Sequence, residues 1–313
     1  MRLNNKIYTC LIILILMPQK FVFCKKSSMS AITYWIKKEG KWGRFGDHVL
    51  TYIKSKYLAY KYKLPFYYFP FEYCDDLMIS ELEKKLTDDV KKGFKKFVKV
   101  SGGHKIKRNA NHLYASTLGS RVGNYRDKKF LKELRKTLAP IEPIEEPNIP
   151  EGRISVAVHV RKGGGYDRPL LSRRRWTSYA DKNFPFKFPP DKYYIDQIKK
   201  LYEILNKRPM HVHIFTDDRA PEKIVEKYKK ALKITSITFS CREKGNYHNK
   251  NVLQDFFAMT RFDCLIRSKS HFSVCADIIG DFAIVISPTH FKWRGDTLII
   301  DKVNVSVRRE INN

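Results

Sequence analysis

The second half of the chain alternates apolar, strand-like runs with helix-like segments, and this alternation limits the possible folds more than any other feature. Strand-like runs are expected at 154–160, 211–216, 234–239, 263–266 and 283–286, with helices at 191–206, 221–232, 252–261 and 273–279 between them. Strands that alternate with helices form βαβ units, in which the strands run parallel. The sequence therefore predicts an α/β fold with a parallel sheet in this half.

Ligands of parallel α/β sheets bind beyond the carboxyl ends of the strands, so the loops at these ends are the first candidates for a site. The predicted strands that end at Val160, Thr216 and Ile266 place three such loops at one crevice. The first loop, 161–165, begins with Arg161 and continues with glycines. An arginine guanidinium can hold two phosphate oxygens at once, and glycines let a ligand approach the backbone closely. The alternative is a flexible turn with a surface arginine.

The other two loops also carry polar side chains that suit a nucleotide. Ser270 and Ser273 lie where a helix would begin, and hydroxyls, free backbone N–H groups and the helix dipole together favour a phosphate there. Asp217 and Asp218 follow the strand at 211–216, where a carboxylate could accept hydrogen bonds from a guanine edge or a ribose. The competing interpretations are a plain serine N-cap and an ordinary turn before the next helix.

The first half opens with a β-loop-α-β pattern: a strand at 31–36, a glycine turn at 43–47, a helix at 48–63 and a strand at 64–69. The lysine-rich stretch 79–138 is expected to be helical. A proline-rich segment at 141–150 cannot continue a helix, so it marks the predicted boundary between an N-terminal lobe, 25–150, and a C-terminal lobe, 151–313.

The chain is strongly basic, with 61 Lys and Arg against 32 Asp and Glu and a formal net charge of +29. Such a charge attracts polyanions, including anionic membrane surfaces, nucleic acids and phosphorylated small molecules. A polyanion-binding protein is therefore a rival interpretation, and aromatic, basic segments such as 91–99 would suit it. Nucleic acid is the less favoured partner because no nucleic-acid-binding motif accompanies the charge.

Residues 1–24 differ from the rest of the chain, because an apolar run at 7–17 follows two basic residues. This run is shorter than the roughly 20 residues of a membrane-spanning helix but matches the core of an export signal. We expect a signal peptide, with an uncleaved membrane anchor as the alternative, and hence an exported or membrane-associated protein. In an oxidising compartment the later cysteines could form disulfides: Cys74, Cys241, Cys264 and Cys275.

Four stretches resemble, in order, the motifs of the fucosyltransferase superfamily. Gly-Arg-Phe-Gly at 43–46 resembles the opening signature of protein O-fucosyltransferases and the Gly-x-x-Gly-Asn-Gln of bacterial α1,2-fucosyltransferases. Residues 159–163 are similar to their His-x-Arg-x-Gly motif, and 215–218 resemble Phe-Ser-Asp-Asp. Residues 255–259 and 270–273 resemble Asp-x-x-x-Met and Ser-Ser-Phe-Ser. Each motif is short, but the ordered set is fairly specific.

The resemblance implies a GT-B-like fold, in which two Rossmann-type lobes enclose a donor cleft. It also implies inverting transfer of fucose from GDP-fucose to a hydroxyl of a glycan or glycoprotein, with neither a metal nor another cofactor. Arg161 would bind the β-phosphate and stabilise the departing GDP, His159 would line the donor site, and Asp217 or Asp218 would contact the nucleoside. The resemblance assigns further donor-binding residues to both lobes: Gly43, Arg44, Gly46, Ser270, Phe272 and Ser273.

The chain departs from the family pattern at positions that matter for chemistry. The Asn and Gln that follow Gly-x-x-Gly are Asp47 and His48 here. Gly164 replaces the Asp that usually follows His-x-Arg-x-Gly, and Asp167 lies three residues further on. Asp47 and Asp167 are therefore the candidates for a general base that activates the acceptor hydroxyl. A catalytically silent, lectin-like relative is the alternative to an enzyme.

Overall fold

The structure is a computed structural model that describes residues 29–34, 43–100, 105–117, 125–163, 184–243 and 245–311. The predicted leader 1–24 and the base candidate Asp167 lie outside these ranges. Within them, no helix combines the length and the apolar character needed to cross a membrane. Their four cysteines, Cys74, Cys241, Cys264 and Cys275, are free thiols.

The C-terminal part of the chain is built on a six-stranded sheet with the order β11-β10-β9-β6-β7-β8. Its strands are β6 (Ile154–Val160), β7 (Met210–Thr216), β8 (Ile237–Cys241), β9 (Cys264–Arg267), β10 (Ile284–Arg294) and β11 (Thr297–Val307). All neighbouring strands pair in parallel except β10 and β11, which form an antiparallel hairpin. Every residue of β6 is buried, as is typical of a central parallel strand. The predicted α/β fold with a parallel sheet is confirmed.

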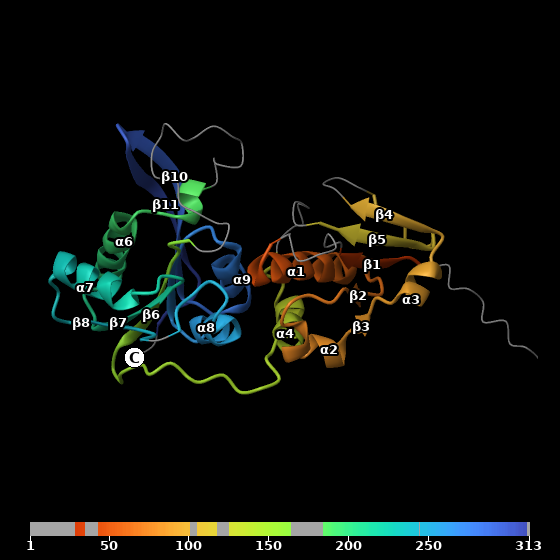
Figure 1. The fold of residues 1–313 in the computed structure, drawn as a ribbon, viewed down its shortest axis with the longest axis horizontal. Helices are drawn as coiled ribbons and strands as arrows, with labels where there is room; N and C mark the ends of the chain where they lie inside the picture. Colours follow the sequence, from red (N-terminus) through yellow and green to blue (C-terminus); the bar gives the residue numbers. More distant parts are fainter. Residues whose placement is uncertain are drawn as a thin grey trace, which may run out of the picture.

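Helices cover both faces of this sheet, as Figure 1 shows. They are α5 (Phe184–Lys187), α6 (Asp191–Ile204), α7 (Pro221–Leu232), α8 (Val252–Met259) and α9 (His271–Ile279). Because side chains alternate along a strand, Val156 and Val158 of β6 pack with α6 and α7, whereas Ala157 packs with α8 and α9. The sheet is therefore the middle layer of three.

The strand order also fixes where a ligand can bind. From β6 the chain proceeds to β7 and β8 on one side, then returns to place β9 and β10 on the other. The order of the strands thus reverses between β6 and β9, and α/β sheets bind ligands beyond the carboxyl ends of the strands at such a switch point. Arg161 directly follows β6, and Arg267 is the last residue of β9.

The N-terminal part contains a parallel three-stranded sheet with the order β1-β5-β4 and a two-stranded sheet of β2 and β3. Its elements are β1 (Ala31–Tyr34), α1 (Phe45–Tyr62), β2 (Tyr67–Tyr68), the 3-10 helix η1 (Cys74–Asp76), α2 (Ile79–Leu82), β3 (Lys84–Lys85), α3 (Asp88–Lys92), β4 (Lys96–Val100), β5 (His112–Ser116) and α4 (Lys128–Thr137). The segment 141–150, which the sequence marks as a boundary, holds neither helix nor strand and runs between α4 and β6 (Figure 1).

The prediction that 79–138 is helical was wrong in part, because the stretch contains β3, β4 and β5 as well as α2, α3 and α4. The edge strand β4 carries exposed lysines at 96 and 99, which hide its strand character. Charged side chains are common on edge strands because they discourage pairing with other chains. The prediction also ended the last strand at Ile286 and missed the rest of β10 and all of β11, whose outer residues are largely exposed.

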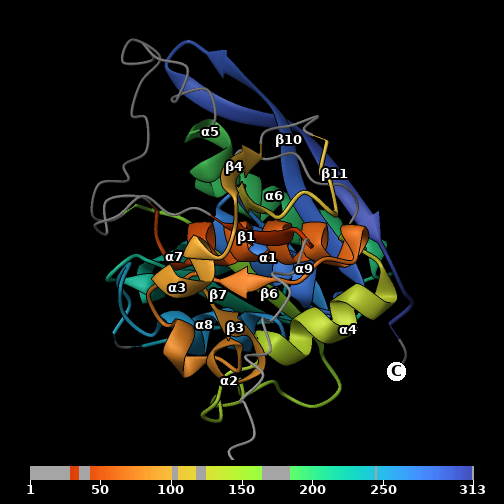
Figure 2. The same ribbon diagram turned by 90° about the vertical axis from the view of Figure 1, so that its right-hand side faces the viewer.

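Helix α1 meets α9 where the N-terminal and C-terminal parts touch, and Figure 2 shows α1 crossing in front of α9. The helix begins at Phe45, three residues before the predicted start, because Asp47 accepts a hydrogen bond of 2.9 Å from the backbone N–H of Arg44 and so caps the first turn. A Cβ atom on Gly46 would lie 2.4 Å from the backbone nitrogen of Phe272. Only glycine lets the two helices approach this closely.

Candidate active site

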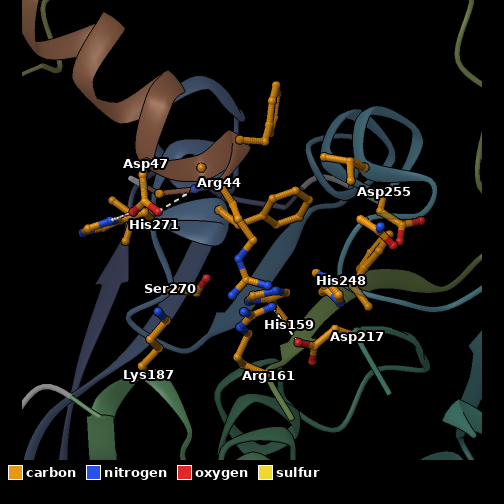
Figure 3. Close-up of a pocket in the computed structure, with 18 of the residues that line it drawn as sticks. Arg44, Asp47, His159, Arg161, Lys187, Asp217, His248, Asp255, Ser270 and His271 are labelled. Carbon is orange, nitrogen blue, oxygen red and sulfur yellow. Dashed lines mark hydrogen bonds and ion pairs between the residues drawn. The ribbon is translucent and has the colours of Figure 1, made fainter. Parts of the chain in front are cut away.

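A cavity of about 810 Å³ lies at the carboxyl ends of β6, β7 and β9, where the start of α1 faces α9. Both parts of the chain contribute to its wall, as the close-up in Figure 3 shows. Most of the residues that the sequence singled out line it: Gly43, Arg44, Gly46, Asp47, His159, Arg161, Asp217, Ser270 and Phe272. The crevice expected from the three loops is therefore present.

Arg161 is held rigidly at the end of β6. Its side chain is only 9% exposed, and its Nη1 atom donates a hydrogen bond of 2.6 Å to Asp217. The Asp217 carboxylate also accepts the backbone N–H groups of Lys162 at 2.7 Å and Gly163 at 3.2 Å. Charge-assisted hydrogen bonds of this kind hold a side chain in a defined geometry and also stabilise it. Asp217 thus orients Arg161 and the loop behind it, and its contact with a nucleoside stays a prediction.

Arg267 brings a second guanidinium to the cavity from the end of β9. Its Nε and Nη2 atoms lie 3.1 and 2.9 Å from Oδ2 of Asp277, and its Nη1 donates to the Ser268 carbonyl at 3.1 Å. From the sequence, this residue belongs only to the loop expected after the strand at 263–266. The signal that could have found it is its place at the end of a strand, where it lies in register with His159 of the neighbouring strand β6.

The amino terminus of α9 forms the wall between the two guanidinium groups and α1. Ser270 is the N-cap residue, is only 6% exposed and lines the cavity, and its side chain accepts no capping hydrogen bond within the helix. Phe272 stacks on His159 with a ring separation of 5.6 Å. The free N–H groups of such a helix end are a ready site for an anion.

The structure does not bring Ser273 or Asp218 to the cavity. Ser273 is fully buried, and its hydroxyl donates to the carbonyl of Ser270 at 3.2 Å. Asp218 accepts the backbone N–H of Ala220 at 2.9 Å and so closes the turn before α7. Both residues support the loops that hold the site, rather than forming its surface.

His159 presents a neutral imidazole to the cavity. Burial lowers the pKa of His159 to about 4. The nearby Asp217 carboxylate opposes this shift, and the charge of Arg267 adds to it. Its Nδ1 atom is buried and has no hydrogen-bond partner among the residues the structure describes. A neutral imidazole offers one donor and one acceptor, so His159 can hydrogen-bond to a ligand without adding charge.

Asp47 joins the two parts of the chain across the cavity. Its Oδ1 lies 2.5 Å from Nδ1 of His271, while Oδ2 accepts the Arg44 backbone N–H. Burial alone would raise the pKa of Asp47, but the hydrogen bond and charge of His271, the Arg44 N–H and the charge of Lys187 lower it overall. The carboxylate is therefore ionised at neutral pH. The other base candidate, Asp167, lies outside the described ranges.

Two further groups of residues line the cavity, and within them only Asp255 belongs to a sequence motif. At one end, Lys187 and Lys269 line the wall, and the Lys269 ammonium lies 4.0 Å from the ring centroid of Phe186. Burial lowers the pKa of Lys269, and the charge of Arg267 lowers it further. Lysines scattered through a lysine-rich chain carry no distinguishing signal, so only the fold identifies these two.

The opposite end of the cavity is aromatic and polar. Tyr247 and His248 line it, and the guanidinium of Arg219 lies 4.5 Å from the Tyr247 ring centroid. Asp255, in the Asp-x-x-x-Met segment, accepts a hydrogen bond of 2.7 Å from Nη2 of Arg242. Burial raises the pKa of Asp255, and Arg242 opposes the rise. A flat aromatic surface beside hydrogen-bonding groups is suited to a nucleobase.

A resident metal would need a cluster of ligating side chains. In the part of the chain that the structure describes, no group of three or more His, Cys, Asp or Glu side chains is arranged to hold a metal ion. Metal-independent chemistry stays a prediction.

No protein-family model matches the chain, and no curated protein matches its sequence. Solved structures with a similar fold do exist. The chain is similar to POFUT1 in complex with GDP-fucose, with 14% identity over 82% of this chain and 96% of that one and a TM-score of 0.48. It is similar to a mutant of Arabidopsis thaliana FUT1 in complex with GDP, with 11% identity over 82% and 70% of the two chains and a TM-score of 0.47.

A third similar structure is the NodZ alpha-1,6-fucosyltransferase soaked with GDP-fucose. The identity is 10%, the match covers 90% of this chain and 98% of that one, and the TM-score is 0.40. Fold and cavity define the class: an α/β protein with a cationic pocket at the switch point of its parallel sheet.

Proposed function

We propose that this protein is a glycosyltransferase that moves fucose from GDP-fucose to a hydroxyl of a glycan or glycoprotein. The observation that supports the proposal most directly is that Arg161 and the Ser270 amino terminus of α9 line one cavity. A fixed guanidinium and a helix N-terminus together can neutralise a diphosphate. A nucleoside diphosphate sugar carries its negative charge at this group.

The arrangement favours departure of the nucleoside diphosphate. As the bond between the sugar C1 and the β-phosphate oxygen breaks, negative charge grows on the leaving diphosphate. Arg161 is already held in place by Asp217, and Arg267 by Asp277, so neither side chain has to reorganise during the reaction. Preorganised charge of this kind stabilises a transition state more than the ground state. These cations can serve the charge-stabilising role without a metal.

The two parts of the chain would bind different substrates. We place the donor on the C-terminal part, 151–313, which supplies both guanidinium groups and α9, and the acceptor on the side of residues 25–150. Transfer with inversion requires the acceptor hydroxyl to attack C1 from the side opposite the diphosphate. Export or membrane association through residues 1–24 belongs to the same proposal.

GDP is expected to raise the melting temperature of the purified protein. A ligand at 100 times its Kd stabilises the native state by about 2.7 kcal/mol, which corresponds to an upward Tm shift of a few degrees. The measurement is thermal denaturation with GDP or GDP-fucose, in parallel with UDP- and ADP-sugars, each with and without EDTA. An unchanged Tm at millimolar GDP-fucose would contradict the proposal, and a shift that EDTA removes would contradict metal independence.

A second candidate function, polyanion binding, is supported by a basic surface on the N-terminal part. The surface consists of exposed lysines on and beside β3, α3 and β4: Lys84, Lys85, Lys91, Lys92, Lys95, Lys96 and Lys99. These elements lie at the end of the molecule away from the six-stranded sheet (Figure 1). If this surface binds RNA or phosphatidylserine vesicles, the affinity should fall steeply with salt and GDP should not compete. Salt-sensitive RNA or vesicle binding without any GDP-induced Tm shift would favour this candidate.

A further inference from the structure

Two residues that differ from the fucosyltransferase motifs contact each other in the structure. Asp47 stands where the Gly-x-x-Gly-Asn pattern has asparagine, and His271 stands where Ser-Ser-Phe-Ser has its second serine. The two positions are 224 residues apart in the sequence, yet Nδ1 of His271 lies 2.5 Å from Oδ1 of Asp47. Each substitution alone is ordinary for a loop, but together they create a carboxylate–imidazole pair inside the cavity.

The pair lies on the cavity wall, and Nδ1 is the imidazole nitrogen of His271 that has a hydrogen-bond partner among the described residues. Both residues line the same cavity as Arg161, and Figure 3 shows them on the side away from Asp217 and Asp255. The His271 side chain is 40% exposed, whereas that of Asp47 is 25% exposed. Because the carboxylate engages Nδ1, the proton of a neutral imidazole is held there and Nε2 keeps its lone pair. Nε2 can therefore accept a proton from a bound hydroxyl.

The charges around His271 come from several elements. Asp47 and Arg44 face it from the start of α1, Lys187 from α5 and Lys269 from the loop before α9. Most of the other ionisable groups near α9 are paired or neutral: Asp255 with Arg242, Arg161 with Asp217, Asp277 with Arg126, Arg267 and Arg308, and neutral His159. Lys54 of α1 lies near Cys275 of α9. Of these groups the Asp47 carboxylate contacts His271 directly, so it can stabilise the imidazolium that forms when the imidazole takes up a proton.

We propose that His271 is the general base that takes the proton of the acceptor hydroxyl, and that Asp47 is the positioning residue that orients its imidazole. This inference rests on the proposed glycosyl transfer and names the residue that activates the nucleophile. Asp47 itself is the weaker candidate because both of its oxygens are engaged, Oδ1 by His271 and Oδ2 by the Arg44 N–H.

The proposed step balances without another reactant. The acceptor oxygen forms a bond to C1 of the sugar, and the bond between C1 and the β-phosphate oxygen breaks with its electron pair leaving on GDP. The acceptor proton moves to Nε2 of His271, and the resulting imidazolium is stabilised by the adjacent Asp47 carboxylate. The proton then passes to solvent. The same base can activate water, so slow hydrolysis of GDP-fucose reports on it when no acceptor is supplied.

The test compares four forms of the full-length protein: wild type, His271→Asn, Asp47→Asn and His290→Asn. In His271→Asn the new side-chain amide can still hydrogen-bond to Asp47 but has no basic nitrogen. His290→Asn is the matched control, because His290 forms a similar pair with Asp301, at 2.6 Å, on the hairpin outside the cavity. GDP release from GDP-fucose is measured from pH 5 to 9, with water and with a panel of glycan acceptors, beside the GDP-induced Tm shift.

His271→Asn is expected to lower kcat by about 10²- to 10⁴-fold, the usual worth of a general base, while the GDP-induced Tm shift stays as in wild type. The wild type and His271→Asn should differ in the pH dependence of the rate, because only the wild type has a basic nitrogen at this position. Asp47→Asn is expected to lower kcat roughly 10- to 100-fold, because a neutral partner orients the imidazole but no longer stabilises its charge. His290→Asn should behave as wild type.

Several outcomes would overturn the inference and leave donor binding intact. These are wild-type kcat in His271→Asn, a pH–rate profile that this substitution leaves unchanged, or GDP-fucose binding by the wild type with no GDP release under any condition. A loss of activity in His271→Asn accompanied by an equal loss of the GDP-induced shift would assign His271 to donor binding instead. If the wild type fails to bind GDP at all, the proposed function itself fails.

Discussion

Replacement of Arg161 by alanine is expected to lower glycosyl transfer by about 10²- to 10³-fold, the effect of removing one preorganised donor from a developing negative charge. The GDP-induced rise in Tm should also disappear, because Arg161 contacts the diphosphate in the bound ground state as well. Both quantities follow from one purified variant, by GDP-release kinetics and thermal denaturation. Retention of either the Tm shift or most of the activity would contradict the assigned role of Arg161.

The interpretation of this variant depends on folding, because Arg161 and Asp217 form a buried pair. Removal of one member of such a pair typically costs about 3–5 kcal/mol, since the remaining charge is left uncompensated. The double variant Arg161→Met with Asp217→Asn removes both charges, and the amide oxygen introduced by the second substitution can still accept the N–H groups of Lys162 and Gly163. We expect it to recover most of the lost stability but not GDP binding. Recovery of both would assign Arg161 a purely structural role.

The sequence predicted those parts of the fold whose signals are local. Strand β6 is mostly apolar because both faces of the sheet are covered. Prolines mark the starts of α6 and α7 in the sequence. Strand β4, the outer part of β10 and all of β11 were missed because most of their exposed residues are polar or charged. Their strand character depends on pairing partners, which no single segment reveals.

In the candidate site, too, the sequence predicted the residues whose signals are local and missed those that depend on tertiary packing. Arg161 was found because the end of a buried strand is recognisable in the sequence. The choice between Ser270 and Ser273 depended on where α9 begins: the helix starts at His271, which leaves Ser270 as the N-cap at the cavity and turns Ser273 into the interior. The contact between Asp47 and His271 joins two distant helix starts, so it depends on how α1 packs against α9 and has no signal in either segment.

Replacement of Gly46 by alanine is expected to destabilise the protein by about 1–3 kcal/mol or more, as in other overpacked interiors. The new Cβ would lie 2.4 Å from the backbone nitrogen and 2.8 Å from the Cα of Phe272, and backbone atoms cannot rotate away as a side chain can. The helices α1 and α9 must therefore separate. Separation would lengthen the contact between Asp47 and His271, so transfer should fall as well as Tm.

Gly46→Ala also distinguishes assembly of the cavity from donor binding. Arg161, Asp217 and Arg267 all belong to the C-terminal part, so the GDP-induced Tm shift should be weakened less than the rate of transfer. The matched control is Gly93→Ala at the exposed end of α3, where the new Cβ would meet only its own helix, 3.2 Å from the Val90 carbonyl. This control should stay close to wild type in both measurements. If Gly46→Ala behaved like this control in both measurements, the contact between Asp47 and His271 would not depend on the close packing of α1 against α9.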